Sequence, residues 1–200
     1  MSLSLNELRG PMQRILSPFV SALARVGLTP NGATILGFLL NAAAGALLAL
    51  GYITTGGIVL IVASLFDLVD GLLARTTGQT TQFGAFLDST VDRYSESALF
   101  FGLIIYHVSH QEFFSALLMV LALIGSQQVS YTRARAEGLG VKGEVGLMPR
   151  PERMFLLATG LLSGSIIWEP LWFVANVLLA VLTNLTVLQR VLYVRRQLKS

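Results

Sequence analysis

Long apolar runs separated by short polar stretches dominate the chain. Six runs are long enough for helices, at residues 31–50, 57–75, 84–106, 112–136, 153–168 and 171–193. A helix of about 20 apolar residues crosses the roughly 30 Å hydrocarbon core of a bilayer. Most runs are joined by short turn-forming stretches, and the longest connection extends from Glu137 to Glu152. The pattern predicts an all-α integral membrane protein with six transmembrane helices.

The residues before the first run have a different pattern. Apolar residues recur there at roughly helical spacing with arginines between them, at Leu5, Leu8, Met12, Ile15, Leu16, Phe19 and Leu23. No uninterrupted apolar segment typical of a signal peptide is present in this stretch. We expect an N-terminal amphipathic helix that lies on the membrane surface. The predicted organisation is one membrane domain over 1–200, with an interfacial segment at 1–28 and a six-helix bundle at 29–200.

Composition and charge support this organisation. Of the 200 residues, 54% are hydrophobic and 12% are charged, and the net charge is +3. With six spans both termini share one side, and all 14 Lys and Arg residues fall on that side. This asymmetry predicts a multi-pass protein of the cell membrane with both termini in the cytoplasm. It also accounts for the basic charge, so we expect no nucleic-acid partner. The absence of cysteine excludes disulfides and thiolate chemistry.

Four aspartates stand where the second run ends and the third begins. Asp67 and Asp70 are three residues apart, and Asp88 and Asp92 are four apart, so each pair shares one helix face. The segment 75–84 is long enough to turn the chain, which makes the two helices antiparallel neighbours. Charged groups near the hydrocarbon cost about 2.5–3.5 kcal/mol each on insertion scales, so four carboxylates there need partners.

A divalent cation would remove the repulsion between these carboxylates. Mg²⁺ prefers oxygen ligands and often shares them with substrate phosphates. Two such ions can clamp a pyrophosphate during phosphoryl transfer, with one carboxylate serving as general base. The alternatives are a structural acidic cluster paired with Arg75 and Arg93, or a non-enzymic pathway for cations.

The spacing of this region resembles the signature of the CDP-alcohol phosphotransferase family. Eight identities match at fixed intervals: Asp67, Asp70, Gly71, Ala74, Arg75, Gly84, Asp88 and Asp92. The resemblance implies a six-span homodimeric membrane enzyme that transfers a phosphatidyl-type group from a CDP-linked lipid to an alcohol and releases CMP. It also implies an active site on the cytoplasmic side.

The resemblance further implies roles for individual residues. Asp67, Asp70, Asp88 and Asp92 are expected to bind two Mg²⁺ or Mn²⁺ ions, and Asp92 is also expected to be the catalytic base. The expected CDP-lipid contacts are Gly71, Ala74, Arg75 and Thr81, together with Asn31 and Thr34 in a stretch at the start of the first span that is similar to a second nucleotide-contacting region of the family. Asn31 stands where some relatives have Asp.

Basic residues also gather around the connection between the fourth and fifth runs. Arg forks suit bidentate binding of phosphate, which favours an acceptor that itself carries a phosphate. Arg-Ala-Arg-Ala-Glu followed by Pro-Glu-Arg is similar to the phosphatidylinositol phosphate synthase branch of the family. By that likeness Arg133, Arg153 and Arg190 bind the acceptor phosphate. The alternative role for these arginines is to bind anionic lipid or fix topology.

The predicted reaction is transfer of a phosphatidyl group from CDP-diacylglycerol to a myo-inositol monophosphate, which gives phosphatidylinositol phosphate and CMP. Phosphatidylglycerol phosphate synthesis and archaetidylinositol phosphate synthesis are the alternatives within the family. We expect His107 and His110 to be ordinary loop residues, and Trp168 and Trp172 to be interfacial anchors. Glu96, one turn after Asp92, either orients that base or pairs with Arg93.

Overall fold

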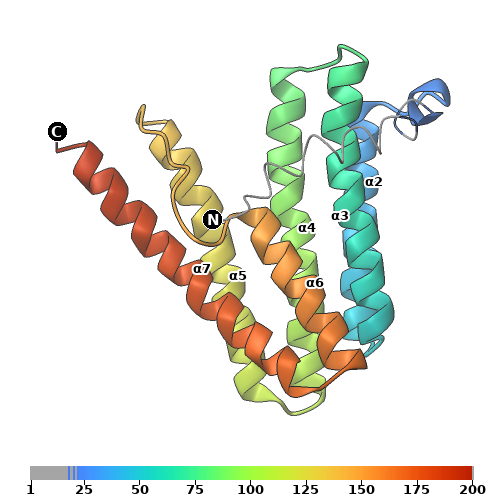
Figure 1. Ribbon diagram of the computed structural model, residues 1–200, viewed down its shortest axis with the longest axis vertical. Helices are drawn as coiled ribbons and strands as arrows, with labels where there is room; N and C mark the ends of the chain where they lie inside the picture. The colour runs from blue at the N-terminus through green and yellow to red at the C-terminus, as the bar shows by residue number, and fades with distance from the viewer. Residues whose placement is uncertain (1–17, 19, 21, 200) are drawn as a thin grey trace. The chain divides into compact units, whose positions relative to one another are not determined.

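The computed structural model describes residues 18, 20 and 22–199, and it is helical throughout. Six long helices follow one another: α2 (Pro30–Ala49), α3 (Ile53–Thr76), α4 (Gln82–Ser109), α5 (Phe113–Glu137), α6 (Arg150–Ile166) and α7 (Pro170–Gln197) (Figure 1). No strand occurs in this part of the chain, which confirms the all-α prediction. The expected interfacial helix over 1–28 falls largely outside the described residues. Residues 22–25 of that segment are helical.

Four of these helices are long and apolar enough to cross a membrane, namely α2, α3, α5 and α7. Among the other two, α6 has only 17 residues, and the first half of α4 carries Asp88, Asp92, Arg93 and Glu96. Large apolar side chains on all six helices face outward, as with Leu39, Ile61, Phe101, Leu117, Phe155 and Val181. Because such surfaces are stable against lipid rather than water, the chain is a multi-pass membrane protein.

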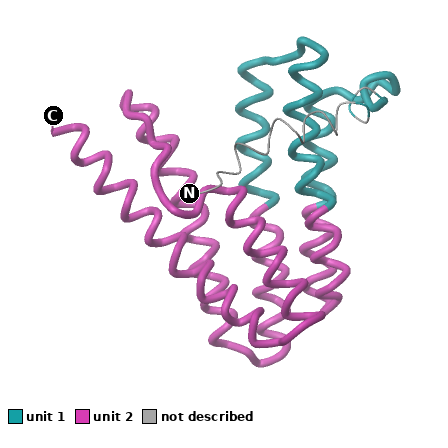
Figure 2. The backbone as a smooth tube through the Cα atoms, viewed as in Figure 1, with its two compact units in different colours: residues 1–40, 62–95 teal, residues 41–61, 96–200 magenta. Residues whose placement is uncertain are grey.

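The helices are shared between two compact units (Figure 2). Unit 1 comprises residues 1–40 and 62–95, and unit 2 comprises residues 41–61 and 96–200. In unit 1 the first half of α2 packs against the second half of α3 through a small buried core of Val20, Ala33, Val69, Leu72 and Leu73. The spacing of the last three residues places this core on one face of α3 and leaves the neighbouring face for polar residues.

Unit 2 is held together by small residues at its helix contacts. A Cβ at Gly102 of α4 would lie 2.1 Å from the carbonyl oxygen of Gly45 on α2, so the two backbones touch. A Cβ at Gly160 of α6 would lie 2.4 Å from the Cβ of Ala175 on α7. The Gly160 and Gly164 pair in the sequence is therefore a packing surface. Close backbone approach of this kind is the usual way in which helices associate within a bilayer.

Candidate active site

One face of α3 carries the polar residues of unit 1. Asp67, Asp70, Gly71 and Ala74 follow one another at the spacing of a single helical stripe. Asp70 is 6% exposed, and the hydroxyl of Thr34 on α2 donates a hydrogen bond of 2.9 Å to its Oδ2. A buried carboxylate requires such a donor. Thr34 and Asp70 therefore join α2 to α3 at the candidate site.

The other carboxylates lie around Asp70. Asp67 and Asp88 are both close enough to act electrostatically on Asp70. Asp67 also lies against α2, because a Cβ at Gly37 would stand 3.1 Å from its Oδ1. Asp92 is half-buried one turn beyond Asp88 on α4. The predicted convergence of α3 and α4 carboxylates is thus present for Asp67, Asp70 and Asp88.

The chemistry of this donor set fits a hard divalent cation, because the ligands are carboxylate oxygens from two helices. As the side chains stand, no three carboxylate or histidine groups in the described chain are arranged closely enough to hold a metal ion. Like charges repel one another, and Thr34 draws one oxygen of Asp70 towards α2. A metal site at these carboxylates would therefore require their side chains to reorient.

Two helix N-termini meet beside the carboxylates. Thr29 accepts a hydrogen bond from the Gly32 amide of α2, and Thr81 accepts one of 2.9 Å from the Gly84 amide of α4. A Cβ at Gly84 would lie 3.3 Å from the Oδ1 of Asn31, so the first turns of these two helices are in contact. Helix N-termini carry partial positive charge, which favours a bound anion such as a diphosphate.

Two of the predicted CDP-lipid contacts lie together on α3. The Nη2 atom of Arg75 would be 3.7 Å from a Cβ at Gly71, so the exposed guanidinium folds back along its own helix over that glycine. Because Gly71 has no side chain, this face of α3 is open, and Arg75 supplies a fixed positive charge beside it.

Arg153 forms a buried ion pair within unit 2. Its Nε and Nη2 atoms donate to the two carboxylate oxygens of Glu96 at 2.6 and 2.9 Å, and both side chains are about 1% exposed. Its Nη1 donates to the carbonyl of Met148 at 2.9 Å. The sequence did not indicate Arg153 as the partner of Glu96, because the two residues are 57 positions apart and belong to no common motif.

Arg190 on α7 contacts the loop between α5 and α6, which also contains Met148. This residue of α7 is 4% exposed and donates to the carbonyls of Val145 and Val129. The hydroxyl of Thr186 accepts a hydrogen bond from the Met148 amide at 3.1 Å. The loop between α5 and α6 is therefore fixed by three side chains that reach its backbone.

Arg133 is the exposed member of the predicted acceptor group. Its guanidinium donates to Glu137 and Glu144 at 2.8 and 2.7 Å, and its side chain is 48% exposed. Arg133 and Arg153 both lie close enough to Arg190 to repel its charge. The structure therefore brings the three predicted arginines together, and such a concentration of positive charge favours a bound phosphate.

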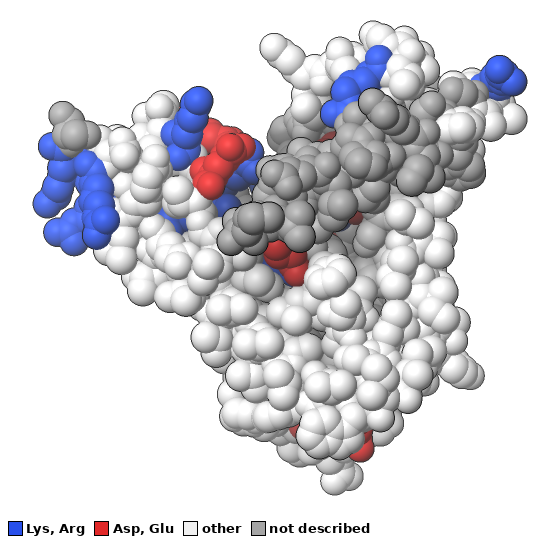
Figure 3. Space-filling model, viewed as in Figure 1, with Lys and Arg blue, Asp and Glu red and all other residues white. Residues whose placement is uncertain are grey.

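Charge is unevenly distributed along unit 2. On the face in Figure 3, Lys and Arg gather towards the C-terminal end of α7, and only acidic patches are visible at the opposite end of this unit. At that opposite end the prediction for His107 is wrong, because this residue lies in α4 and is fully buried. His110 is exposed in the turn, Trp168 is exposed, and Trp172 packs against the core.

A membrane protein whose first unit carries a carboxylate stripe beside two helix N-termini, and whose second unit carries a group of arginines, is suited to phosphate-transfer chemistry. The model of the CDP-alcohol phosphatidyltransferase family matches residues 27–188. The chain belongs to this family and is a transferase of phospholipid synthesis.

Among its relatives, the archaetidylinositol phosphate synthase of Methanothermobacter thermautotrophicus is 38% identical over 98% of this chain and 96% of its own length. The phosphatidylinositol phosphate synthase of Mycobacterium tuberculosis is 39% identical over 91% of this chain and 86% of its own length.

Two crystal structures of the Mycobacterium tuberculosis enzyme are similar to this chain. The complex with CDP-DAG has a TM-score of 0.86 at 38% identity and covers 90% of this chain and 94% of that one. The complex with manganese and citrate has a TM-score of 0.85 at 38% identity, over 89% of this chain and 88% of that one. Divalent metal is thus bound by a close relative.

Thr34→Val should weaken activation by metal, because it removes the hydroxyl that orients Asp70. Loss of a residue that orients a ligand typically costs about 10–100-fold in metal affinity or activity. The measurement is the Mg²⁺ concentration needed for half-maximal CMP release. Thr34→Ser keeps the donor and is the control, and equal behaviour of the two variants would contradict the assigned role.

Glu96→Gln should destabilise the fold, because it leaves the buried charge of Arg153 without its counter-ion. Breaking a buried pair in this way costs about 3–5 kcal/mol. Thermal unfolding in detergent measures the loss. Glu144→Gln removes a carboxylate from an exposed pair with Arg133 and should change the melting temperature little. Equal shifts in the two variants would argue against a special role for the buried pair.

Proposed function

We propose that this chain transfers a phosphatidyl group from CDP-diacylglycerol to a myo-inositol monophosphate, with phosphatidylinositol phosphate and CMP as products. The observation that carries the proposal is the convergence of Arg133, Arg153 and Arg190 around a fixed loop. An acceptor without a phosphate would have no use for three arginines in one place. The phosphatidylinositol phosphate synthases among the relatives support the same acceptor.

The donor is proposed to bind in unit 1. Its diphosphate would lie near the N-termini of α2 and α4, where Asn31, Thr34 and Thr81 stand, and Arg75 would neutralise part of its charge. Gly71 and Ala74 are small, so a nucleotide could approach the backbone of α3 closely at this face.

The four aspartates are proposed to serve metal binding and proton transfer. Asp67, Asp70, Asp88 and Asp92 would hold two Mg²⁺ or Mn²⁺ ions. When bound, the cations supply positive charge that stabilises the diphosphate during transfer. Asp92 takes the proton of the acceptor hydroxyl, whose oxygen forms a bond to the lipid-side phosphorus. The bond from that phosphorus to the CMP oxygen breaks, and CMP leaves with the electron pair.

The acceptor phosphate is proposed to bind at the arginine group of unit 2. Arg133 is the member best placed to exchange partners, because its two carboxylate contacts are exposed and therefore weak. Arg153 and Arg190 already use several donors on Glu96 and on the loop backbone. They would contribute positive charge and a fixed frame behind Arg133.

We further propose that all six helices α2–α7 cross the membrane, with both termini and the active site in the cytoplasm. The one-sided distribution of Lys and Arg supports this orientation. The charges in the first half of α4 belong to the site and explain its lower hydropathy. The N-terminal segment 1–28 would lie on the membrane surface, 29–200 would form one bundle, and the enzyme would be a homodimer.

An archaeal ether-lipid donor is the second candidate, because an archaetidylinositol phosphate synthase matches nearly the whole chain. This donor would differ from CDP-diacylglycerol in its lipid tails, and the proposed acceptor would be the same.

Purified protein given CDP-diacylglycerol and Mg²⁺ should release CMP with inositol 1-phosphate. Inositol and serine should give little release, because they lack the phosphate, and glycerol 3-phosphate should give little because the named relatives are synthases of inositol phosphate lipids. Mass spectrometry of the lipid product confirms the acceptor, and CDP-archaeol in a parallel series tests the donor. CMP release with glycerol 3-phosphate alone would overturn the proposed acceptor.

Arg133→Gln should raise the KM for inositol phosphate and leave the KM for the CDP-lipid nearly unchanged. Loss of one charged hydrogen bond corresponds to about tenfold or more in the acceptor KM. Arg135→Gln on the same helix is the matched control. Equal increases in both KM values would remove Arg133 from the acceptor site.

Asp92→Asn should reduce CMP release by about 10²–10⁴-fold, because the amide cannot accept the hydroxyl proton. Binding of CDP-lipid should persist at a similar affinity, as measured by isothermal titration. Near-normal turnover would exclude Asp92 as the base.

A further inference from the structure

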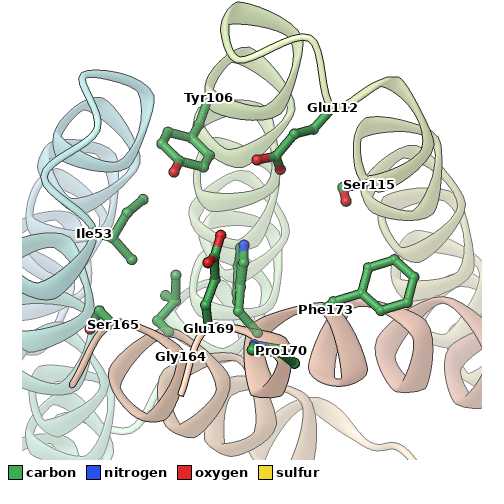
Figure 4. Close-up of a pocket in the computed structure, with 11 residues that line it drawn as sticks. Ile53, Tyr106, Glu112, Ser115, Gly164, Ser165, Glu169, Pro170 and Phe173 are labelled. Carbon is green, nitrogen blue, oxygen red and sulfur yellow. The ribbon is translucent and has the colours of Figure 1, made fainter. Parts of the chain in front are cut away.

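A cavity lies at the end of unit 2 where α4 is joined to α5 and α6 to α7 (Figure 4). Its volume is about 670 Å³. Asp92 and the cavity residue Tyr106 are both on α4, 14 positions apart. The residues that line the cavity have no part in the proposed transfer reaction, and none of them is Lys or Arg.

Two carboxylates and a phenol point into this space. In Figure 4 the polar ends of Tyr106, Glu112 and Glu169 face one another across the cavity. Both carboxylates are close enough to the Tyr106 hydroxyl to act on it electrostatically. Glu112 and Glu169 occupy the N-cap positions of α5 and α7, but neither side chain caps its helix. Helix capping therefore does not explain why these two carboxylates point into the cavity.

A buried polar chain fixes one of these carboxylates. The Nδ1 of His107 donates to the Oε2 of Glu112 at 2.7 Å, and the amide of Asn176 contacts the His107 Nε2 at 3.2 Å. His107 and Asn176 are both fully buried, and His107 stacks on Trp172 with ring centroids 5.6 Å apart. Buried polar side chains in a membrane bundle are costly and usually serve a site.

The remaining lining adds hydrogen-bond donors and aromatic surface. The Nε1 of Trp172 is buried and has no acceptor. Ser115 and Ser165 contribute hydroxyls, and Phe173 contributes an aromatic wall. Carboxylates with aromatic rings bind organic ammonium groups, and an unpaired N–H donor such as that of Trp172 suits a phosphate oxygen.

The surroundings of the cavity resemble a membrane interface. Large apolar side chains are exposed at the helix ends and in the turn that flank the cavity, at Phe113, Phe114, Ile166, Ile167 and Trp168. Aromatic residues gather at the level of lipid headgroups.

We propose that this cavity binds an ammonium-bearing phosphate headgroup of the phosphoethanolamine type. Glu169 and Glu112 would contact the ammonium group, and Trp172 would donate to the phosphate. The site would let the enzyme sense a zwitterionic lipid through a cavity of unit 2 that contains none of the four aspartates.

The test uses the full chain with Trp168→Phe, which leaves Trp172 as the only tryptophan. The protein is placed in phosphatidylglycerol nanodiscs that contain increasing fractions of phosphatidylethanolamine. Trp172 emission should change saturably, and N-acetylated phosphatidylethanolamine, which lacks the ammonium charge, should have no effect. In a second series, soluble phosphoethanolamine should also change the Trp172 emission, because the proposed contacts are made by the headgroup alone.

Glu169→Gln should weaken the response by about tenfold or more, because it removes an exposed carboxylate without disturbing the buried chain. Glu144→Gln should leave the response unchanged. CMP release by Glu169→Gln should equal that of the parent, so the result does not depend on the proposed acceptor. An equal response to the N-acetylated lipid, or no effect of Glu169→Gln, would overturn the proposal.

Discussion

The buried ion pair between Arg153 and Glu96 is the constraint on which the second unit depends. An arginine at about 1% exposure is tolerated only when its charge and its donors are satisfied. Glu96 provides the charge and two oxygens, and Met148 provides a carbonyl. Glu96 therefore neutralises the Arg153 charge and anchors α6 to α4. Through Met148, Arg153 also fixes the loop between α5 and α6.

The ion pair also links α4, which carries the proposed catalytic base, to the loop between α5 and α6. Glu96 follows Asp92 by one turn on the same helix, so the helix that carries the proposed base also carries the ion-pair partner of Arg153. Helix geometry is rigid over such a distance. Arg190 and Thr186 reach the same loop from α7, and Arg133 stands at its exposed edge. The loop is thus a preorganised frame, and preorganisation limits the rearrangement that binding of a ligand requires.

Local patterns were sufficient for much of this account. The spacing of Asp67 and Asp70 indicated that they share one face of α3, since residues three or four apart on a helix lie on the same side. The turn-forming segment 75–84 indicated that α4 would bring Asp88 back beside them. Gly160 and Gly164 of α6 have the spacing typical of a helix-packing surface, and the structure places α7 against it. Long-range partners were not predictable, because no periodic signal connects Glu96 to Arg153.

His107 was misassigned for a related reason. The polar stretch around it is typical of a turn, but the helix continues to Ser109 and the chain turns at Gln111, where φ is 61°. Its partners Glu112 and Asn176 come from two other segments, and they make burial of the imidazole possible.

The most direct test of the central claim replaces both members of the buried pair, as Glu96→Gln with Arg153→Gln. Removal of both charges leaves no uncompensated ion, so the melting temperature should recover towards that of the parent. Transfer to inositol phosphate should stay impaired through a raised acceptor KM, because a neutral amide cannot supply the charge of Arg153. A stable double variant with a normal acceptor KM would contradict the account and reduce the pair to a structural contact.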